Sequence, residues 1–325
     1  MRLNCQISKD IIVHSGVPQG SHLGPLLFIL FVNDLCDKLQ ECFYLFYADD
    51  LKIFKVISGV EDAMVLQQNI VNVNQWCREN DMLLNVSKCK FVSFSRRRIR
   101  PTIHFNYDIQ ETALEKCTCI NDLGIMLDEK LNMISHFEFI VNKARRIWGF
   151  VKRQSKEFMN PYVTKSLYTS LVRPHLEYCS VVWMPHSRCH IEKLESIQKQ
   201  FLLFALRDLG WSHRFILPPY HHRLQLLNMS SLEDRRLVST ATFMYKLVNN
   251  IIDVPSLKEN IRVNESRYMT RNRNVVLVNN HSTNYGQNAP MTRLLKLFNE
   301  YYDIYEESLS VNSFKSSIKK RIQHT

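Results

Sequence analysis

Two adjacent aspartates, Asp49 and Asp50, stand inside an apolar and aromatic segment that runs from Cys42 to Phe54 (CFYLFYADDLKIF). Aromatic and branched residues favour strands, so the segment predicts a β-hairpin with the two acids at its tip. Buried like charges raise each other's pKa unless a cation neutralises them. Mg²⁺ binds one or two carboxylates together with substrate phosphates, which makes the pair a candidate metal site.

Such a site could carry out nucleotidyl transfer. Two magnesium ions about 3.5–4 Å apart can activate a hydroxyl nucleophile and stabilise a leaving pyrophosphate. Neighbouring residues of a strand point to opposite faces, so only Asp49 or Asp50 would be a full ligand. The alternative is an ordinary Asp-Asp turn whose carboxylates are solvated.

The segment before the hairpin concentrates glycine in a chain that uses it sparingly. Only 8 of 325 residues are glycine, and three of them are Gly16, Gly20 and Gly24. This clustering indicates unusual backbone geometry. We expect a short strand at 11–13, then a loop, then a helix over 26–39. Because that helix is apolar nearly all round at its start, it should be buried.

Periodicity predicts a helix over 61–80, a turn and strand over 83–94, and short strands between 103 and 127. From about residue 136 the pattern becomes helical. The expected helices are 136–155, 161–173, 190–207 and 229–249, followed by a polar stretch over 265–290 and one or two helices in 291–322.

The charge of the chain favours a polyanionic partner, with nucleic acid the leading candidate. The net charge is +11 and the pI is near 9.2. Residues 141–214 hold 13 Lys and Arg against 5 Asp and Glu, a local excess of +8. Helical spacing puts several of these cations on one face, which suits the backbone of a duplex. The candidates are Lys143, Arg145, Arg146, Lys152 and Arg153. A merely basic soluble protein with a solvated helix face is the alternative.

Other classes of function are disfavoured. Residues 1–10 have no apolar core of a signal peptide, so reduced thiols in an intracellular protein are expected. The longest apolar run, 26–32, is far shorter than the ~20 residues of a membrane span. Cys117 and Cys119 have the wrong spacing for a zinc knuckle, and Cys189 with His190 has no partner pair. The length suggests about two domains.

Several segments together resemble one family. Tyr47–Asp50 within FYADDLKIF, preceded by SGVPQGSHLGPLLF at 15–28, resembles the catalytic and preceding motifs of reverse transcriptases. The resemblance covers essentially the whole chain, and its later segments resemble the thumb region of jockey-like, LINE-type elements, which are non-LTR retrotransposons. Later segments that continue it are Trp76-Cys77, Asn85–Lys88, Leu123–Asp128 with Leu131 and His136, YTSLVRPHLEYCSVVW at 168–183, Leu194-Glu195, Gln198, 220–236 and Ser313–Lys315.

This resemblance implies an α+β fold with a partial right-hand polymerase palm, consisting of the catalytic β-hairpin plus helices. It implies a palm over 1–130, a basic helical thumb over 131–215, and a C-terminal helical extension and tail over 216–325. The implied reaction is RNA-directed DNA synthesis with Mg²⁺ as cofactor. The implied partners are an RNA template, a DNA primer and deoxynucleoside triphosphates, and no membrane.

Roles in the family can be carried over by position. Asp49 matches the metal-binding aspartate, and Asp50 is its neighbour. Tyr47 matches the residue that packs against the primer end and minor groove. Gln19 and Gly20 match the loop that lines the incoming nucleotide and the templating base.

A lysine further along the chain also has a counterpart in the family. Lys88 matches a lysine proposed as general acid for pyrophosphate departure, although Cys89 replaces the usual threonine beside it. A solvated lysine is the alternative for Lys88.

The chain departs from the family before the glycine-rich loop. Family members place another catalytic aspartate on a strand well upstream, whereas fourteen residues precede Ser15, and Asp10 lies too close to the loop. The fingers, an endonuclease domain and a Cys/His knuckle are not matched either. Because catalysis needs geometry held to about half an ångström, we expect negligible polymerase activity from this chain alone. The palm sheet would keep an unpaired edge that is prone to association.

Two other classes of function stay open. One is a non-catalytic nucleic-acid-binding protein that uses the basic thumb. The other is a host protein that uses the thumb helices for protein contacts. Cytoplasm and nucleus would both suit the ancestral element.

Overall fold

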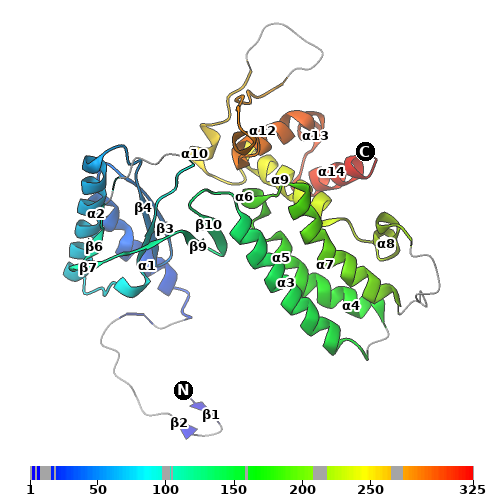
Figure 1. The fold of residues 1–325 in the computed structure, drawn as a ribbon, viewed down its shortest axis with the longest axis horizontal. Coiled ribbons are helices and arrows are strands. Elements are labelled where there is room, and N and C mark those ends of the chain that lie inside the picture. The colour runs from blue at the N-terminus through cyan, green and yellow to red at the C-terminus, as the bar shows by residue number, and fades with distance from the viewer. Residues whose placement is uncertain are drawn as a thin grey trace. The chain divides into compact units, whose positions relative to one another are not determined.

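The computed structural model contains helices and small two-stranded sheets, in keeping with the expected α+β class (Figure 1). It divides the chain into two compact units, Met1–Thr118 and Cys119–Thr325. The three-part division into palm, thumb and extension stays a prediction. The structure describes residues 2–3, 6–7, 16–17, 20–96, 103, 105–157, 160–207, 218–264 and 274–324.

The first unit contains the aspartate pair. After the two-residue strands β1 (Arg2–Leu3) and β2 (Gln6–Ile7), its elements are α1 (Gly24–Val32) with a 3₁₀ turn (Asn33–Lys38), the antiparallel strands β3 (Phe43–Tyr47) and β4 (Asp50–Phe54), and the helix α2 (Val60–Glu79). The predicted hairpin and the predicted helix over 61–80 are therefore confirmed, whereas the predicted strand at 11–13 lies outside the described residues.

A small core holds the helix α2 beside the 3₁₀ turn and the hairpin. Its buried members are Leu35, Leu39, Val73, Trp76 and Cys77. Phe46, Leu51 and Ile53 of the hairpin pack against them, as do several neighbours. The hairpin thus turns one face of its strands towards this core.

Two polar side chains of α2 hold this helix in place. The Asp62 carboxylate caps α2 by accepting hydrogen bonds from the backbone N–H groups of Ser58 (2.8 Å) and Gly59 (3.2 Å). These bonds lower its pKa. The buried Asn69 amide exchanges two hydrogen bonds with the backbone of Gln40, which ties the middle of α2 to the loop before β3.

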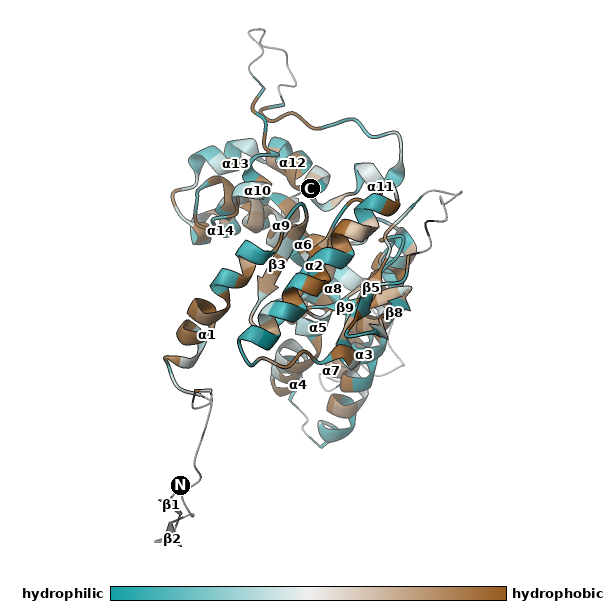
Figure 2. Cartoon of the chain, turned by 90° about the vertical axis from the view of Figure 1, so that its left-hand side faces the viewer, coloured by the Kyte–Doolittle hydropathy of each residue, from teal (hydrophilic) through white to brown (hydrophobic). Residues whose placement is uncertain are grey.

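Helix α1 departs from the sequence expectation. It begins at Gly24 with Pro25 in its first turn, yet none of its residues is buried. Leu26, Ile29 and Leu30 are 54%, 59% and 66% exposed. Figure 2 shows the apolar character of the helix along its length. The expectation of a buried helix is wrong for the described residues. The 3₁₀ turn and Trp76 cover only part of the surface of α1, and the ring centres of Phe31 and Trp76 are 5.6 Å apart.

The rest of the first unit consists of short strands, as expected from the sequence. A 3₁₀ turn at Val86–Lys88 leads into β5 (Lys90–Val92), which pairs in parallel with β8 (Glu115–Cys117). Strands β6 (Asp108–Ile109) and β7 (Thr112–Ala113) form a small hairpin.

The second unit begins with the hairpin β9 (Cys119–Asp122) and β10 (Ile125–Asp128), which packs on α3 (Ile134–Gln154). The helices that follow are α4 (Pro161–Leu167), a π-helical turn (Tyr168–Val172), α5 (Arg173–Glu177), α6 (Ser180–Trp183) and α7 (Arg188–Arg207). The predicted helix over 161–173 is therefore interrupted by the π turn.

The C-terminal part of this unit is also helical. Its elements are α8 (Tyr220–Leu226), α9 (Leu232–Val248), α10 (Pro255–Lys258), α11 (Asn284–Gln287), α12 (Pro290–Glu300), α13 (Tyr302–Glu307) and α14 (Val311–His324). The tail thus forms three helices rather than one or two, because the backbone leaves the helical conformation at Tyr301 and again at Ser308.

Two apolar cores stabilise the second unit. The first joins α3, the π turn and α7 around Trp148, Tyr168 and Phe201. The second joins α9 to α12, α13 and α14 around Met244 and Phe314. Among the residues that the structure describes, none of the helices combines the length and the apolar character of a membrane span.

Candidate active-site hairpin and basic helix face

The aspartate pair lies at the tip of a tight hairpin. Tyr47 and Asp50 are the last paired residues, so Ala48 and Asp49 form the two-residue turn. Ala48 has φ +52°, a left-handed conformation that costs an L-residue roughly 1–2 kcal/mol. Backbone strain of this kind is common where a structure must aim a functional side chain. The sequence prediction of acids at the hairpin tip is confirmed.

Both carboxylates are open to solvent, as is the Tyr47 side chain, which is 64% exposed. The argument that buried like charges require a cation is therefore wrong for this pair. Asp49 and Asp50 could give the one or two carboxylates that Mg²⁺ takes with phosphates and water. Across the described part of the chain, however, no group of three or more His, Cys, Asp or Glu side chains gathers to hold a metal. The described residues thus form part of a metal site at most.

The glycine-rich loop has the unusual geometry that its composition predicts. Gly16 and Gly20 have φ values of +84° and +81°, whereas Gly24 begins α1. A side chain at Gly20 would be strained even though nothing lies within 4 Å of its missing Cβ. Gln19 lies outside the described residues.

Lys88 ends a 3₁₀ turn in the same unit and is exposed. No hydrogen bond or ion pair in the described part of the chain joins Lys88 or Gly20 to the aspartates. Their roles in nucleotide handling therefore stay predictions.

The outer face of the hairpin is apolar. Phe43, Leu45 and Tyr47 of β3 point away from the core and are 63%, 58% and 64% exposed. Phe43 stacks on Phe54 of the neighbouring strand at 5.5 Å. Among the described residues β3 and β4 pair only with each other, so both outer edges of this sheet are unpaired. Unpaired edges of this kind can accept a further strand.

A family comparison bears on this unit. Residues 1–137 match the family model described as reverse transcriptase (RNA-dependent DNA polymerase). Residues 1–137 are a reverse transcriptase domain. The matched region contains the glycine-rich loop, the aspartate hairpin and Lys88.

Curated relatives place this reverse transcriptase domain with those of LINE-type, non-LTR transposable elements. The chain is 25% identical over 211 residues to a probable RNA-directed DNA polymerase from transposon X-element of Drosophila melanogaster, covering 62% of this chain and 22% of that protein. It is 27% identical over 212 residues to the RNA-directed DNA polymerase from mobile element jockey of Drosophila funebris, covering 61% and 22%.

A third relative is similar over a larger share of the chain. It is the probable RNA-directed DNA polymerase from transposon BS of Drosophila melanogaster, which is 23% identical over 259 residues, or 76% of this chain and 28% of that protein. The chain thus spans about a fifth to a quarter of the length of these relatives. No solved structure matches the chain significantly.

The basic residues downstream of the reverse transcriptase match lie along α3. The buried face of this helix carries Phe137, Ala144 and Trp148, among others, and packs on α7 and the π turn. The five candidate cations lie outside that face, and all but the half-buried Lys143 are exposed. None of the five forms an ion pair with an acid in the described part of the chain. The five are Lys143, Arg145, Arg146, Lys152 and Arg153.

Two of these cations form cation–π contacts with aromatic rings. The Lys143 Nζ lies 5.9 Å from the ring centre of Phe139, and the Lys152 Nζ lies 5.8 Å from that of Phe204. Phe139, Asn142, Lys143 and Arg146 line a shallow hollow on the surface of α3. Within the described part of the chain, the face is therefore cationic and has no ion-pair partners.

Several residues that carry the family resemblance have structural roles. Tyr168 is fully buried and stacks on Phe201 with 4.2 Å between ring centres. Its hydroxyl donates a hydrogen bond to Gln198 Oε1 at 3.2 Å. The Trp183 indole donates to the Tyr178 carbonyl at 2.7 Å. Tyr168 and Trp183, in the segment 168–183, are therefore part of the core of the second unit.

A polar network around α7 escaped the sequence analysis. The buried Glu195 carboxylate accepts hydrogen bonds from the Tyr220 hydroxyl (2.6 Å) and the Glu233 backbone N–H (2.8 Å). Gln198 donates to the Tyr220 hydroxyl and to the Ser230 carbonyl, both at 3.0 Å. Burial raises the pKa of Glu195, against the effect of its hydrogen bonds. The sequence feature that could have indicated this network is a glutamate and a glutamine three positions apart on an apolar helix face.

Proposed function

We propose that this chain provides the metal-binding hairpin and the downstream helical part of an RNA-directed DNA polymerase of a non-LTR transposable element. The observation that carries the proposal is the exposed Asp49-Asp50 pair at a strained hairpin tip, inside the region that matches the reverse transcriptase family. The partners would be an RNA template, a DNA primer and deoxynucleoside triphosphates.

The pair would contribute ligands for Mg²⁺. When bound, the ion would supply charge stabilisation for phosphoryl transfer. The chain's own contribution is to hold two carboxylates in the open at a fixed turn, with Tyr47 beside them on the exposed face of β3. A bridging site needs another carboxylate, so we propose that the chain alone has negligible polymerase activity.

Two measurements test these statements separately. Electron paramagnetic resonance measures how tightly the chain binds Mn²⁺ when template–primer and nucleotide are present. The affinity for Mn²⁺ should fall in Asp49→Asn. It should be unchanged in Asp81→Asn, a matched loss of an exposed acid in the same unit, at a left-handed position that asparagine tolerates. Equal Mn²⁺ binding in both variants would refute the metal role of Asp49.

Primer extension on poly(rA)/oligo(dT) tests the activity. Extension by the wild-type chain with Mg²⁺ or Mn²⁺ should not exceed that of Asp49→Asn. Extension that Asp49→Asn abolishes would mean that the chain completes its own metal site.

The basic face of α3 favours a second candidate function, which is nucleic-acid binding without catalysis. Each Lys or Arg that neutralises a phosphate of a duplex contributes about −0.9 to the slope of log affinity against log salt. Replacing Arg146 and Arg153 by Gln should therefore reduce that slope by about 2, whereas Asp49→Asn should not change it. Affinity and slope unchanged by the arginine replacements would exclude α3 as the binding face.

A further inference from the structure

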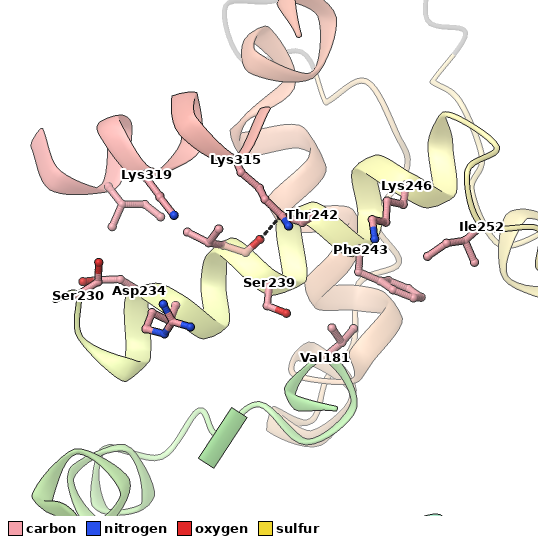
Figure 3. Close-up of a pocket in the computed structure, with 13 residues that line it drawn as sticks. Val181, Ser230, Asp234, Ser239, Thr242, Phe243, Lys246, Ile252, Lys315 and Lys319 are labelled. Carbon is pink, nitrogen blue, oxygen red and sulfur yellow. Dashed lines mark hydrogen bonds between the residues drawn. The ribbon is translucent and has the colours of Figure 1, made fainter. Parts of the chain in front are cut away.

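A cleft of about 390 Å³ lies between α9 and α14 in the second unit, away from the basic face of α3 (Figure 3). Helix α9 forms its floor, α14 forms one wall, and Val181 of α6 and Ile252 lie at its margins. Pockets that bind small ligands usually have volumes of about 300–1,000 Å³, so the cleft is large enough for one.

The cleft is cationic. Lys246 of α9 and Lys315 and Lys319 of α14 line it, and none of the three amines has a hydrogen-bond or ion-pair partner within the described part of the chain. Figure 3 shows Lys315 and Lys319 extending from α14 towards α9.

The remaining charged groups of the lining leave this excess in place. Asp234 is the acid of the lining. The Arg235 guanidinium also lies there, but it is held by the two carboxylate oxygens of Glu177. Three lysines without partners therefore face one aspartate, and the arrangement favours an anionic ligand.

Apolar and aromatic side chains also line the cleft. Phe243 is half-buried, and Val181, Val238, Ile252 and Ile322 complete this surface. The Thr242 hydroxyl already donates to the Val238 carbonyl at 2.6 Å, whereas the Ser239 hydroxyl is exposed. A ligand with an anionic group at one end and a flat apolar group at the other could contact both the lysines and the apolar side chains.

We propose that this cleft binds one nucleoside phosphate unit of a single-stranded nucleic acid, with the phosphate at the three lysines and the base against Phe243. Lysines along a groove neutralise phosphates, and bases stack on aromatic side chains, in proteins that bind single strands. A volume of about 390 Å³ suits a single base and its phosphate rather than a duplex. The site goes beyond the proposed polymerase function, since it involves neither the aspartate hairpin nor α3.

The test uses the full chain and a fluorescein-labelled oligouridylate, with binding followed by anisotropy between about 50 and 200 mM salt. A triple variant, Lys246→Gln, Lys315→Gln and Lys319→Gln, removes the cations of the cleft. The control triple variant, Lys156→Gln, Lys193→Gln and Lys320→Gln, removes the same charge from exposed positions elsewhere in the second unit. Glutamine keeps the helix propensity of lysine, and far-UV circular dichroism checks that each variant folds.

The cleft variant should reduce the slope of log affinity against log salt by about 0.7, since the cleft holds one phosphate and each phosphate contact of a single strand contributes about 0.7. Its affinity should fall about tenfold or more relative to the control variant. Phe243→Leu should weaken binding about tenfold and leave the salt slope unchanged, because it removes stacking and no charge.

Two results would overturn the proposal. Equal affinity and slope for the cleft and control variants would show that the cleft does not hold the strand, while the Mn²⁺ result at Asp49 would be unaffected. Uridine monophosphate used as a second probe separates the sources of the ligand. If it stabilises the wild-type chain against heat but not the cleft variant, and oligouridylate affinity does not depend on the lysines, the site takes a free nucleotide rather than a strand.

Discussion

Protonation of His136 should destabilise the second unit, because this imidazole is buried in its neutral form. The side chain is 1% exposed and lies 5.2 Å from Trp183 between ring centres. Its Nδ1 accepts a hydrogen bond from the Met126 backbone N–H at 3.2 Å, so the proton of the neutral ring is on Nε2. Nε2 has no partner within the described part of the chain, and burial lowers the pKa of His136 to about 4.

The sign and size of the effect follow from linkage. An unfolded histidine has a pKa of about 6.5, so between about pH 6.5 and pH 4 the unfolded chain binds a proton that the folded chain excludes. Stability from His136 is complete above that window and is lost as the pH falls through it. The whole gap corresponds to about 3 kcal/mol, and the part lost between about pH 8 and pH 5 is about 2 kcal/mol.

The assay compares urea unfolding of the wild-type chain with that of His136→Asn at both pH values. The asparagine amide oxygen can accept the Met126 N–H bond but does not titrate. Circular dichroism in the far ultraviolet follows the second unit, which contains α3 to α14.

The difference between the two proteins isolates His136 from other titrating groups. One of these groups is His190, which stacks on Phe137. Burial also lowers the pKa of His190. The wild-type chain should lose about 2 kcal/mol more than the variant on acidification. Equal losses in the two proteins would refute the reasoning.

Three further outcomes are expected. Tyr220→Phe should cost about 1.5–3 kcal/mol in urea unfolding, because it removes the hydroxyl that donates to the buried Glu195 carboxylate; a cost near zero would contradict that network. Asp128→Ala should cost about 2 kcal/mol, since its carboxylate accepts the N–H groups of Lys130, Asn132 and Met133 before α3, and Asp128→Asn should recover part of the loss. Leu30→Lys on exposed α1 should change the unfolding free energy by less than about 0.5 kcal/mol and reduce self-association in light scattering; a loss above about 2 kcal/mol would mean that Leu30 is buried.

Local patterns were sufficient to predict the hairpin and the main helices. The aromatic and branched residues on either side of Asp49 and Asp50 placed both acids at a turn, because such residues favour strands. The 3.6-residue period placed α2, α3 and α7 to within about two residues. The order of motifs identified the reverse transcriptase domain, since a run such as SGVPQGSHLGPLLF followed by FYADDLKIF carries family information that does not depend on packing.

Burial could not be predicted from the same patterns. The apolar sequence of α1 predicted a buried helix, but whether a side chain is covered depends on which distant segments pack against it, and here few do. The carboxylate pair was expected to need charge neutralisation, yet its turn lies in solvent.

Long-range contacts also decided what several polar residues that carry the family resemblance do. Gln198, Tyr168 and His136 could have served catalysis or binding, and only the packing of α3, α7 and the π turn shows them inside a core. The α9–α14 cleft arises in the same way, because Lys246 and Lys315 are 69 positions apart and meet only when the two helices pack. The amino-acid sequence by itself determined the local elements and the family, whereas the tertiary structure decided which side chains are buried, paired or free to meet a ligand, since those properties depend on segments far apart in the chain.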